Sequence, residues 1–539
     1  IMKKIKQILY LCAFLILIAG CDKDFVKINT DPFQINDLDL GLVFAGAQRT
    51  YLGDWESEHT IVQQFVNPFN DGATLGFNFN EDINNFQNGS FNQYYDAGIP
   101  VAPGAVKAFV HILKRLEGTT DEVNLQSITR LWKAFVFMDI VDHYGDVPYF
   151  DAGRATEGEA YFYPAYDDDA AIYDDLYLEI TEALDNLDPN GDYVSADLFY
   201  GAKAFYPTGG AADQVAKWQK LGNSLLLRLG MRYSKLNPTM AASIVSEAFN
   251  GGVMTSNTDN AFVVYDGTLY TNVSNNNLIN NNPRFYYAAE PFVEFLKSTV
   301  DPRSKYIFAS FDEPNNPLGD PTPDTDIANQ FGVPVGVLAS SLASDPYRGI
   351  KGGGYNYSQM NVNVAASVSA PTFWLTYAQT SLLLAEAAHR GWIAGGESAA
   401  QQYYEDGIRA DMDNYSLYLS QTSSTLPEVS AAEQDTYIAQ PGVAYNATDA
   451  LELINTQYWI TNIRNGAEAW ANFRRSGYPE LNRNDFDDQL LENGGDGYVH
   501  RFSYPDAELS RNKTNYQAAV AALVGGLDDL VNRVFWDTP

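Results

Sequence analysis

Histidine and carboxylate side chains are the groups in this sequence that could carry acid–base or metal chemistry. The five histidines are dispersed, and none forms a His-Glu-x-x-His pair, which excludes a zinc protease of that type. His143 lies between Asp142 and Asp146 in DHYGD, where it could hold a metal or move a proton. Its place at the end of a predicted helix favours a structural role, in which the ring interacts with the last carbonyl groups.

The acidic residues leave two further kinds of site to consider. With 68 Asp and Glu, two carboxylates about 5 to 10 Å apart could arise by chance, so glycoside hydrolysis stays an alternative at this point. Asp188, Asn190 and Asp192 alternate as in a calcium loop, but Tyr193 occupies the position that requires glycine, so a structural Ca²⁺ is unsupported. The sequence contains no Gly-x-Ser-x-Gly elbow, Walker A loop or dinucleotide-binding glycine motif. We therefore expect a protein that is not an enzyme and has no cofactor or metal.

The N-terminal residues have the layout of a bacterial lipoprotein signal. Lys3, Lys4 and Lys6 precede an apolar run of about a dozen residues, too short for a transmembrane helix, which needs about 20. The sequence Ile-Ala-Gly-Cys at residues 18–21 resembles a lipobox, in which Cys21 becomes the first mature residue and carries acyl chains. We expect residues 1–20 to be a signal peptide, and Cys21 to anchor the mature chain at a membrane.

The net charge and the amino-acid composition limit the kinds of partner that the protein is expected to bind. The formal net charge is −34, which argues against binding nucleic acid or anionic lipid, because both attract basic surfaces. Aromatic residues make up 14% of the chain, with 35 Tyr and 8 Trp. Such a content, with scattered Asn and Gly, favours a surface that contacts sugars or peptides.

Helical periodicity dominates the chain, with apolar residues three and four positions apart. The predicted helices are Val106–Leu116, Val123–Tyr144, Ala170–Leu187, Ala212–Leu236, Pro291–Thr299, Thr372–Gly391, Ser398–Asn414, Thr448–Asn465 and Lys513–Leu523. Long loops or short strands rich in Asn, Gly and Pro separate them, at residues 70–100, 265–282 and 312–363. Small residues at the crossing of helices 372–391 and 398–414 suggest tetratricopeptide-like packing without a strict repeat. We expect residues 21–539 to form one mostly α-helical domain.

Seven segments of the sequence, taken together, resemble one protein family. They are DFVKINTDPFQ, FMDIVDHYGDVPYFDA, KWQKLGNSLLLRLGMRYSK, DPRSKYIF, TYAQTSLLLAEAAHRGW, WANFRRSGYPEL and RFSYPDAELSRNKTNYQAAV. With the lipobox, and in this order over residues 24–520, they resemble the SusD/RagB family of Bacteroidota outer-membrane lipoproteins. The resemblance implies a mostly α SusD-like fold, with degenerate tetratricopeptide-like helix pairs and long loops with minor β structure.

The resemblance also implies a function at the cell surface. Proteins of this family bind nutrients and act as a lid on a SusC-like TonB-dependent outer-membrane transporter. The expected ligand is an oligosaccharide, with a glycan favoured slightly over a peptide. Two alternatives remain: a peptide-binding RagB-like lipoprotein, and a structural or assembly subunit that binds no ligand itself.

The ligand-binding residues are expected in two sets of loops, by their position in the family. The first set is Trp55, Phe77, Phe79, Tyr94 and Tyr95, and the second is Tyr270, Asn272, Asn276, Tyr355 and Tyr357. Aromatic rings stack on the apolar faces of sugars, while amide groups bond their hydroxyls. Each of these residues could instead pack beneath its own loop.

Overall fold

A computed structural model of the chain describes residues 38–50, 58–68, 91–92, 94–95, 104–281, 287–337, 339–485 and 488–539. Helices dominate these residues. The longer ones are α3 (Leu40–Thr50), α6 (Ala105–Leu116), α7 (Val123–Tyr144), α8 (Asp169–Asn186), α9 (Ala211–Arg232), α10 (Pro238–Gly251), α11 (Val273–Asn281), α12 (Glu290–Ser298), α15 (Tyr377–His389), α16 (Gly396–Gln421), α17 (Ala431–Ile438), α18 (Ala450–Thr461), α19 (Gly466–Ser476) and α22 (Lys513–Ala522). Single-turn helices are α4 (Glu58–Ile61), α13 (Ser304–Ile307), α14 (Ala339–Leu342), α20 (Asp488–Leu491) and α21 (Glu508–Arg511).

The strands are short and belong to three small sheets. They are β1 (Phe65–Val66), β2 (Ala261–Val263), β3 (Tyr287–Ala288), β4 (Phe308–Ala309), β5 (Ile350–Lys351), β6 (Gly354–Tyr355), β7 (Gln359–Met360) and β8 (Thr372–Leu375). One antiparallel sheet has the order β1-β3-β7-β4, and β2 pairs with β8 and β5 with β6. The expectation of a mostly α fold with minor β structure is therefore confirmed.

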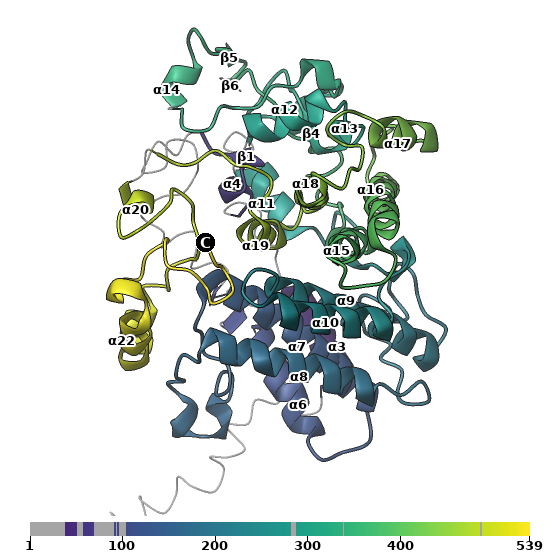
Figure 1. Cartoon of the computed structure of the whole chain (residues 1–539), viewed down its shortest axis with the longest axis vertical. Helices are drawn as coiled ribbons and strands as arrows, with labels where there is room; N and C mark the ends of the chain where they lie inside the picture. Colours follow the sequence, from purple (N-terminus) through teal and green to yellow (C-terminus); the bar gives the residue numbers. More distant parts are fainter. Residues whose placement is uncertain are drawn as a thin grey trace, which may run out of the picture.

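The elements are arranged in three regions (Figure 1). Helices α3 and α6–α10 lie at one end, α15, α16, α18 and α19 in the middle, and α12–α14 with β5 and β6 at the other end. One hydrophobic core extends through the described chain from Phe44 to Trp536. A smaller core around Tyr287, Val333 and Leu342 holds the strand-rich end. None of the described helices is both long and apolar enough to cross a membrane.

Helix α7 is the central element of the helical end. Its bounds agree with the prediction, and most of its side chains are buried, including Trp132 and Phe135, whose rings stack 4.5 Å apart. Asp192 caps its N-terminus from a distant loop, accepting bonds from the amides of Asn124 and Leu125 at 2.7 and 3.0 Å. Gly145 ends the helix at φ 71°, a conformation that glycine adopts without strain.

Helices α15 and α16 form the predicted helix pair and pack closely against each other. Gly407 of α16 allows the close approach, because a Cβ at this position would lie 2.7 Å from Cγ of Leu382. Buried Ala378, Ala385 and Ala388 keep the facing side of α15 small. This packing supports the tetratricopeptide-like interpretation.

Several predicted helices have different boundaries in the structure. The helix predicted to start at Thr372 begins at Tyr377, because Thr372–Leu375 form strand β8 on β2. Thr376 then starts α15 with a capping box, in which it and Gln379 satisfy each other's backbone amides. The helix predicted to reach Leu236 ends at Arg232, the one predicted over 398–414 runs to Gln421, and the one predicted over 448–465 ends at Thr461.

The second half of the segment 265–282, which was assigned to loops or short strands, is helical. The residues after Tyr265 include α11, which the Asn-rich sequence did not indicate. Asn275 holds this helix in place through bonds from its side-chain amide to the carbonyls of Ala365 and Ser367. Tertiary hydrogen bonds here outweigh weak helix propensity.

Candidate ligand-binding site

A cavity of about 790 Å³ lies in the helical end of the described chain. It lies between α3, α6, the segment 148–164 and residues 508–512, and we call it the α3–α6 cavity. Its apolar walls include Leu42, Val43, Phe91, Tyr95, Val110 and Phe162. This volume is in the range that small-molecule sites occupy, and mixed apolar and polar walls suit an amphipathic ligand such as an oligosaccharide.

Helix α6 gives this cavity a basic side. Val106, Phe109 and Ile112 are buried on one face of the helix, so the opposite face is left to solvent. That exposed face carries four basic or titratable side chains, Lys107, His111, Lys114 and Arg115. A local concentration of basic residues is notable in a chain whose net charge is −34.

Phe162 is the aromatic side chain best placed to meet a ligand in the α3–α6 cavity. Its side chain is 52% exposed although it lines the cavity. Next to it in the chain, Tyr161 lies under the Arg154 guanidinium, 4.0 Å from the ring centre. An exposed ring at a cavity wall offers a stacking surface to the apolar face of a sugar.

Of the first predicted set, Tyr94 and Tyr95 are described. Tyr95 lines the α3–α6 cavity, packs against Phe91 with ring centres 4.7 Å apart, and donates its hydroxyl to the Pro148 carbonyl at 2.7 Å. Tyr94 is buried and donates its hydroxyl to the carboxylate of Asp139. Tyr95 thus lines the α3–α6 cavity, whereas Tyr94 is buried in the core and is not among the residues that line the cavity.

Cys21, Trp55, Phe77 and Phe79 lie outside the described residues. The lipidation of Cys21 and the ligand-binding role of the three aromatic residues therefore stay predictions.

Tyr270 of the second set belongs to a group that we call the arginine–tyrosine cluster, made of Arg49, Tyr265 and Tyr270. The Arg49 guanidinium lies 4.2 Å from the centre of the Tyr270 ring, within the range of a cation–π interaction. The rings of Tyr265 and Tyr270 are 4.8 Å apart. Burial raises the pKa of Tyr270 to about 12, since the charged form is disfavoured there.

The two asparagines of the second predicted set form hydrogen bonds within the protein. Asn272 is buried, and its side-chain amide donates to the carbonyl of Ala370 and the hydroxyl of Thr372, each at 3.1 Å. Asn276 is half-buried in α11, where its backbone amide donates to the Asn272 carbonyl. Asn272 therefore positions the loop that carries Tyr270.

Tyr355 and Tyr357 lie in the smaller core at the strand-rich end. Tyr355 is 8% exposed, its ring centre is 5.9 Å from that of Tyr287, and its amide donates to the Tyr287 hydroxyl at 3.2 Å. Tyr357 is 6% exposed and packs in the same core. Both rings thus pack beneath their own loops, and a role in binding stays a prediction.

One face of α3 connects the α3–α6 cavity with the arginine–tyrosine cluster. Leu42 and Gly46 line the cavity, and Arg49 follows three residues later, so the three positions share one side of the helix. The structure thus brings Tyr95 and Tyr270 to two adjoining surfaces. Arg49, Tyr265, Phe162 and the basic face of α6 were not selected from the sequence. Of these, only the basic face of α6 has a sequence signal, which is the helical periodicity of residues 105–116.

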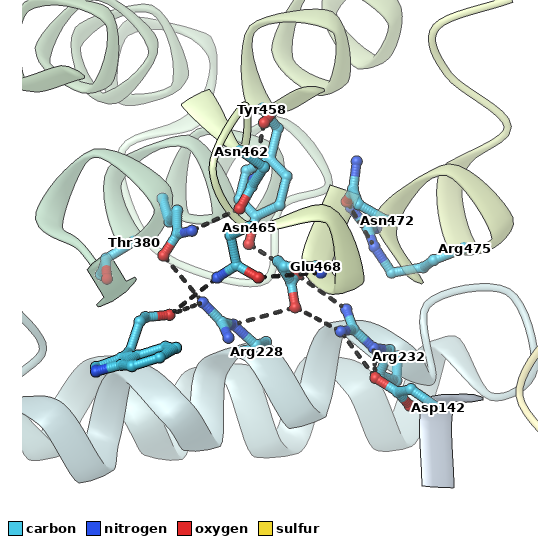
Figure 2. Close-up of polar contacts among 12 residues, drawn as sticks. Asp142, Arg228, Arg232, Thr380, Tyr458, Asn462, Asn465, Glu468, Asn472 and Arg475 are labelled. Carbon is cyan, nitrogen blue, oxygen red and sulfur yellow. Dashed lines mark hydrogen bonds and ion pairs between the residues drawn. The ribbon is translucent and has the colours of Figure 1, made fainter. Parts of the chain in front are cut away.

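A buried polar network joins the helices behind these surfaces. Figure 2 shows Glu468 of α19 between Arg228 and Arg232 of α9, with Asp142 of α7 on the far side of Arg232. Burial alone would raise the pKa of Glu468, but the two guanidinium groups overcome it and lower the pKa to about 2. All four side chains are at most 5% exposed, so this network positions helices and does not meet a ligand.

His143 has a structural environment, as its helix-end position indicated. Its Nε2 lies 2.7 Å from Oε1 of Glu58, and its Nδ1 lies 2.6 Å from the Asp139 carbonyl. Burial disfavours the imidazolium, but Asp139 and Glu58 outweigh burial and raise the pKa to about 9. The ring is 2% exposed and ties α4 to α7.

Asp146, Asp168 and Asp169 form a group whose oxygens lie within 4.8 Å of one another. Each carboxylate accepts a backbone bond: Asp146 from the Asp169 amide, Asp168 from Ala171 and Asp169 from Phe535. Burial raises the pKa of Asp169 to about 7. The three carboxylates therefore lie close together because they cap the start of α8 and hold the C-terminal segment in place.

The comparisons with known proteins agree with this fold. Residues 32–505 match the model of the SusD-like family described as "Starch-binding associating with outer membrane". A chitin-binding protein of known structure is 26% identical, with a TM-score of 0.71, and 92% of this chain and 98% of that chain are covered. No curated protein is similar enough to match.

Two further structures share the fold. A Bacteroidetes SusD-like protein is 23% identical with a TM-score of 0.74, covering 93% of this chain and 100% of its own. A chitin-binding SusD homologue from Flavobacterium johnsoniae is 20% identical with a TM-score of 0.68, covering 93% and 98%. The match over residues 32–505, together with the helical architecture, shows that the chain belongs to the SusD-like family.

Proposed function

We propose that this protein captures an oligosaccharide at the cell surface and delivers it to a SusC-like TonB-dependent transporter, for which it acts as a lid. Membership of a family described as starch-binding supports a glycan ligand, and so does the 26% identical chitin-binding relative. The protein binds its ligand without breaking a bond. Its attachment to the outer membrane is through acyl chains on Cys21, which the lipobox at residues 18–21 supports.

The α3–α6 cavity is the observation that carries the ligand assignment. Its volume of about 790 Å³ accommodates several sugar rings, and Phe162 exposes half of its side chain there. Exposed basic side chains on α6, including Lys107 and His111, can offer hydrogen bonds to sugar hydroxyls. A peptide ligand would be favoured instead by a long exposed strand edge, whereas the described strands have two to four residues.

A binding screen tests the proposal. The soluble chain, residues 22–539, is applied to arrays of oligosaccharides and of peptides, and each hit is titrated by calorimetry. Binding of a glycan class such as chitin or starch fragments is the expected result. Binding of peptides alone contradicts the ligand class, and a folded protein that binds neither favours an assembly role.

The transporter partnership has its own test. Full-length lipoprotein purified in mild detergent from its native outer membrane is expected to co-elute with a TonB-dependent barrel protein identified by mass spectrometry. Elution as an isolated lipoprotein would contradict the partnership while leaving capture intact.

A further inference from the structure

Two adjoining aromatic rings lie at the surface in the loop between α8 and α9. Phe205 and Tyr206 are 37% and 42% exposed. Their ring centres are 4.8 Å apart and their planes meet at 85°, so the two rings form a corner, which we call the aromatic platform. Single exposed apolar residues are ordinary, whereas two adjoining rings offer a surface that can hold a ligand.

The aromatic platform rests on a buried aromatic base. The ring of Phe262, on β2, is 5% exposed, and its centre lies 5.8 and 5.9 Å from those of Phe205 and Tyr206. Phe262 also packs on Phe373, its pairing partner on β8, with ring centres 5.2 Å apart. The pair of strands β2 and β8 therefore supports the two exposed rings from below.

Hydrogen bonds hold the loop in place before any ligand arrives. Buried Asp197 accepts bonds from the side chains of Gln48 and Trp218 at 2.8 and 2.7 Å. On the far side of the two rings, the Thr208 hydroxyl donates to the Tyr200 carbonyl at 2.6 Å. Because the loop is already ordered by these bonds, a ligand would spend little free energy in ordering it.

The aromatic platform lies apart from the α3–α6 cavity. None of the described residues that line the cavity belongs to the loop between α8 and α9. This loop is bound to α3 through Gln48, whose side-chain oxygen accepts the Leu198 amide at 2.8 Å. Gly46 lines the cavity two positions earlier, and positions two apart on a helix do not share a face. A ligand on the platform would therefore be additional to a ligand in the cavity.

The size and chemistry of the platform favour a sugar over a protein. An aromatic side chain can bury about 150 to 250 Å², so the exposed parts of the two rings together offer at most about 200 Å². A stable protein interface needs about 800 Å² on each partner. A sugar ring is much smaller, and its apolar face stacks on an aromatic ring. The Tyr206 hydroxyl has no hydrogen-bond partner within the described chain, and it can bond a sugar hydroxyl.

We propose that Phe205 and Tyr206 form a second glycan-binding site, outside the α3–α6 cavity, on which the apolar face of a pyranose ring stacks. The inference rests on the proposed capture of glycans and goes beyond it, because it adds a surface site with its own residues. The rings supply the stacking surface, and the Tyr206 hydroxyl supplies a polar contact at its edge.

Native gels that contain soluble starch or glycol chitin test the inference. The retardation of the soluble chain, residues 22–539, measures its affinity for each polymer. Wild type is expected to be retarded in at least one gel, because stacking on an aromatic ring accepts many sugars. The double substitution Phe205→Ala/Tyr206→Ala should weaken that affinity about tenfold. Tyr206→Phe should weaken it less, because it keeps the ring and removes only the hydroxyl.

Matched variants locate the effect. Phe150→Ala is the control, since Phe150 is 50% exposed elsewhere on the surface, and it should leave the retardation unchanged. Phe205→Leu keeps an apolar cover over Phe262 without a flat ring, so it should also weaken binding if the double variant does not fold.

The outcomes separate this inference from the proposed function. Unchanged retardation in a folded double variant would overturn the second site, and so would a wild-type protein that neither polymer retards. A double variant that binds both polymers normally but no longer co-elutes with the barrel protein would assign the rings to a protein contact instead. Glycan capture itself is decided by the oligosaccharide array, and a protein that binds no glycan in the array or the gels would overturn both.

Discussion

Glu468 accepts two hydrogen bonds from one guanidinium, with Nη1 and Nη2 of Arg232 lying 3.2 and 2.6 Å from its two oxygens. The same arginine donates from Nε to Asp142 at 3.1 Å. Since Asp142, Arg232 and Glu468 belong to α7, α9 and α19, one side chain joins three helices that are distant in sequence. This buried pairing fixes the scaffold on which the loops of the candidate site rest.

Glu468→Gln should destabilise the protein by about 3 to 5 kcal/mol, because buried Arg228 would lose its anion and buried Arg232 would keep only Asp142. Urea unfolding followed by circular dichroism measures the difference. Glu182→Gln is the control, since Glu182 is 59% exposed and its ion pair with Arg130 should contribute less than about 1 kcal/mol. An equal effect of the two substitutions would contradict a structural role for the network.

Acid should destabilise the protein between about pH 4.5 and pH 2. Arginines overcome burial and lower the pKa of Glu386 and of Glu468 to about 2, from 4.5 in an unfolded chain. Each carboxylate therefore stabilises the fold fully above pH 4.5, and this contribution, at most about 3 kcal/mol each, is lost as the pH falls towards 2. Urea midpoints measured across this interval should fall steeply, and less steeply in Glu468→Gln. A constant midpoint would contradict the assignment.

Val300→Gly should stabilise the protein by about 1 kcal/mol. Val300 follows α12 in the left-handed conformation, at φ 51°, with its amide bonded to the Lys297 carbonyl and that of Asp301 to the Leu296 carbonyl. This position of a Schellman motif favours glycine, because a Cβ in the left-handed conformation lowers the stability of the fold by about 1 to 2 kcal/mol. Thermal unfolding of Val300→Gly and of Val300→Ala separates the two effects, since Ala keeps the Cβ. Destabilisation by Gly would show that the exposed valine side chain contributes packing that outweighs the strain.

Cys21→Ala should abolish membrane attachment. The lipobox predicts that acyl chains on Cys21 hold the protein at the membrane, and alanine cannot carry them. Metabolic labelling with a radioactive fatty acid, followed by fractionation, measures both attachment and acylation. Cys12→Ala is the control, because Cys12 lies within the predicted signal peptide. Label or membrane association that persists in Cys21→Ala would contradict the anchor.

Local signals explain which parts of the fold could be predicted. Helix α7 was predicted correctly because a long apolar pattern ends at Gly145, and both signals are local. Thr372–Leu375 form a continuous apolar run that fits a helix or a strand equally well. Pairing with β2 decides between them, and β2 lies far away in the sequence.

The candidate site was predictable only in part, for the same reason. Tyr270 was selected as a loop aromatic, but its contact with Arg49 depends on the placement of α3, whose sequence carries few helix signals. Tyr355 and Tyr357 had equally suitable sequence surroundings, yet they pack with Tyr287 in a separate core. Composition identifies the kind of residue that binds sugars, whereas exposure is decided by tertiary packing.

Titration of the best oligosaccharide into wild type and Phe162→Ala tests the central claim most directly. Phe162 and Phe150 are 52% and 50% exposed, but of the two only Phe162 lines the α3–α6 cavity, so Phe150→Ala is the matched control. The account predicts that Phe162→Ala weakens binding by about 1 to 2 kcal/mol while Phe150→Ala leaves it unchanged. Unchanged affinity in a folded Phe162→Ala variant would contradict the assignment of this cavity as the glycan site.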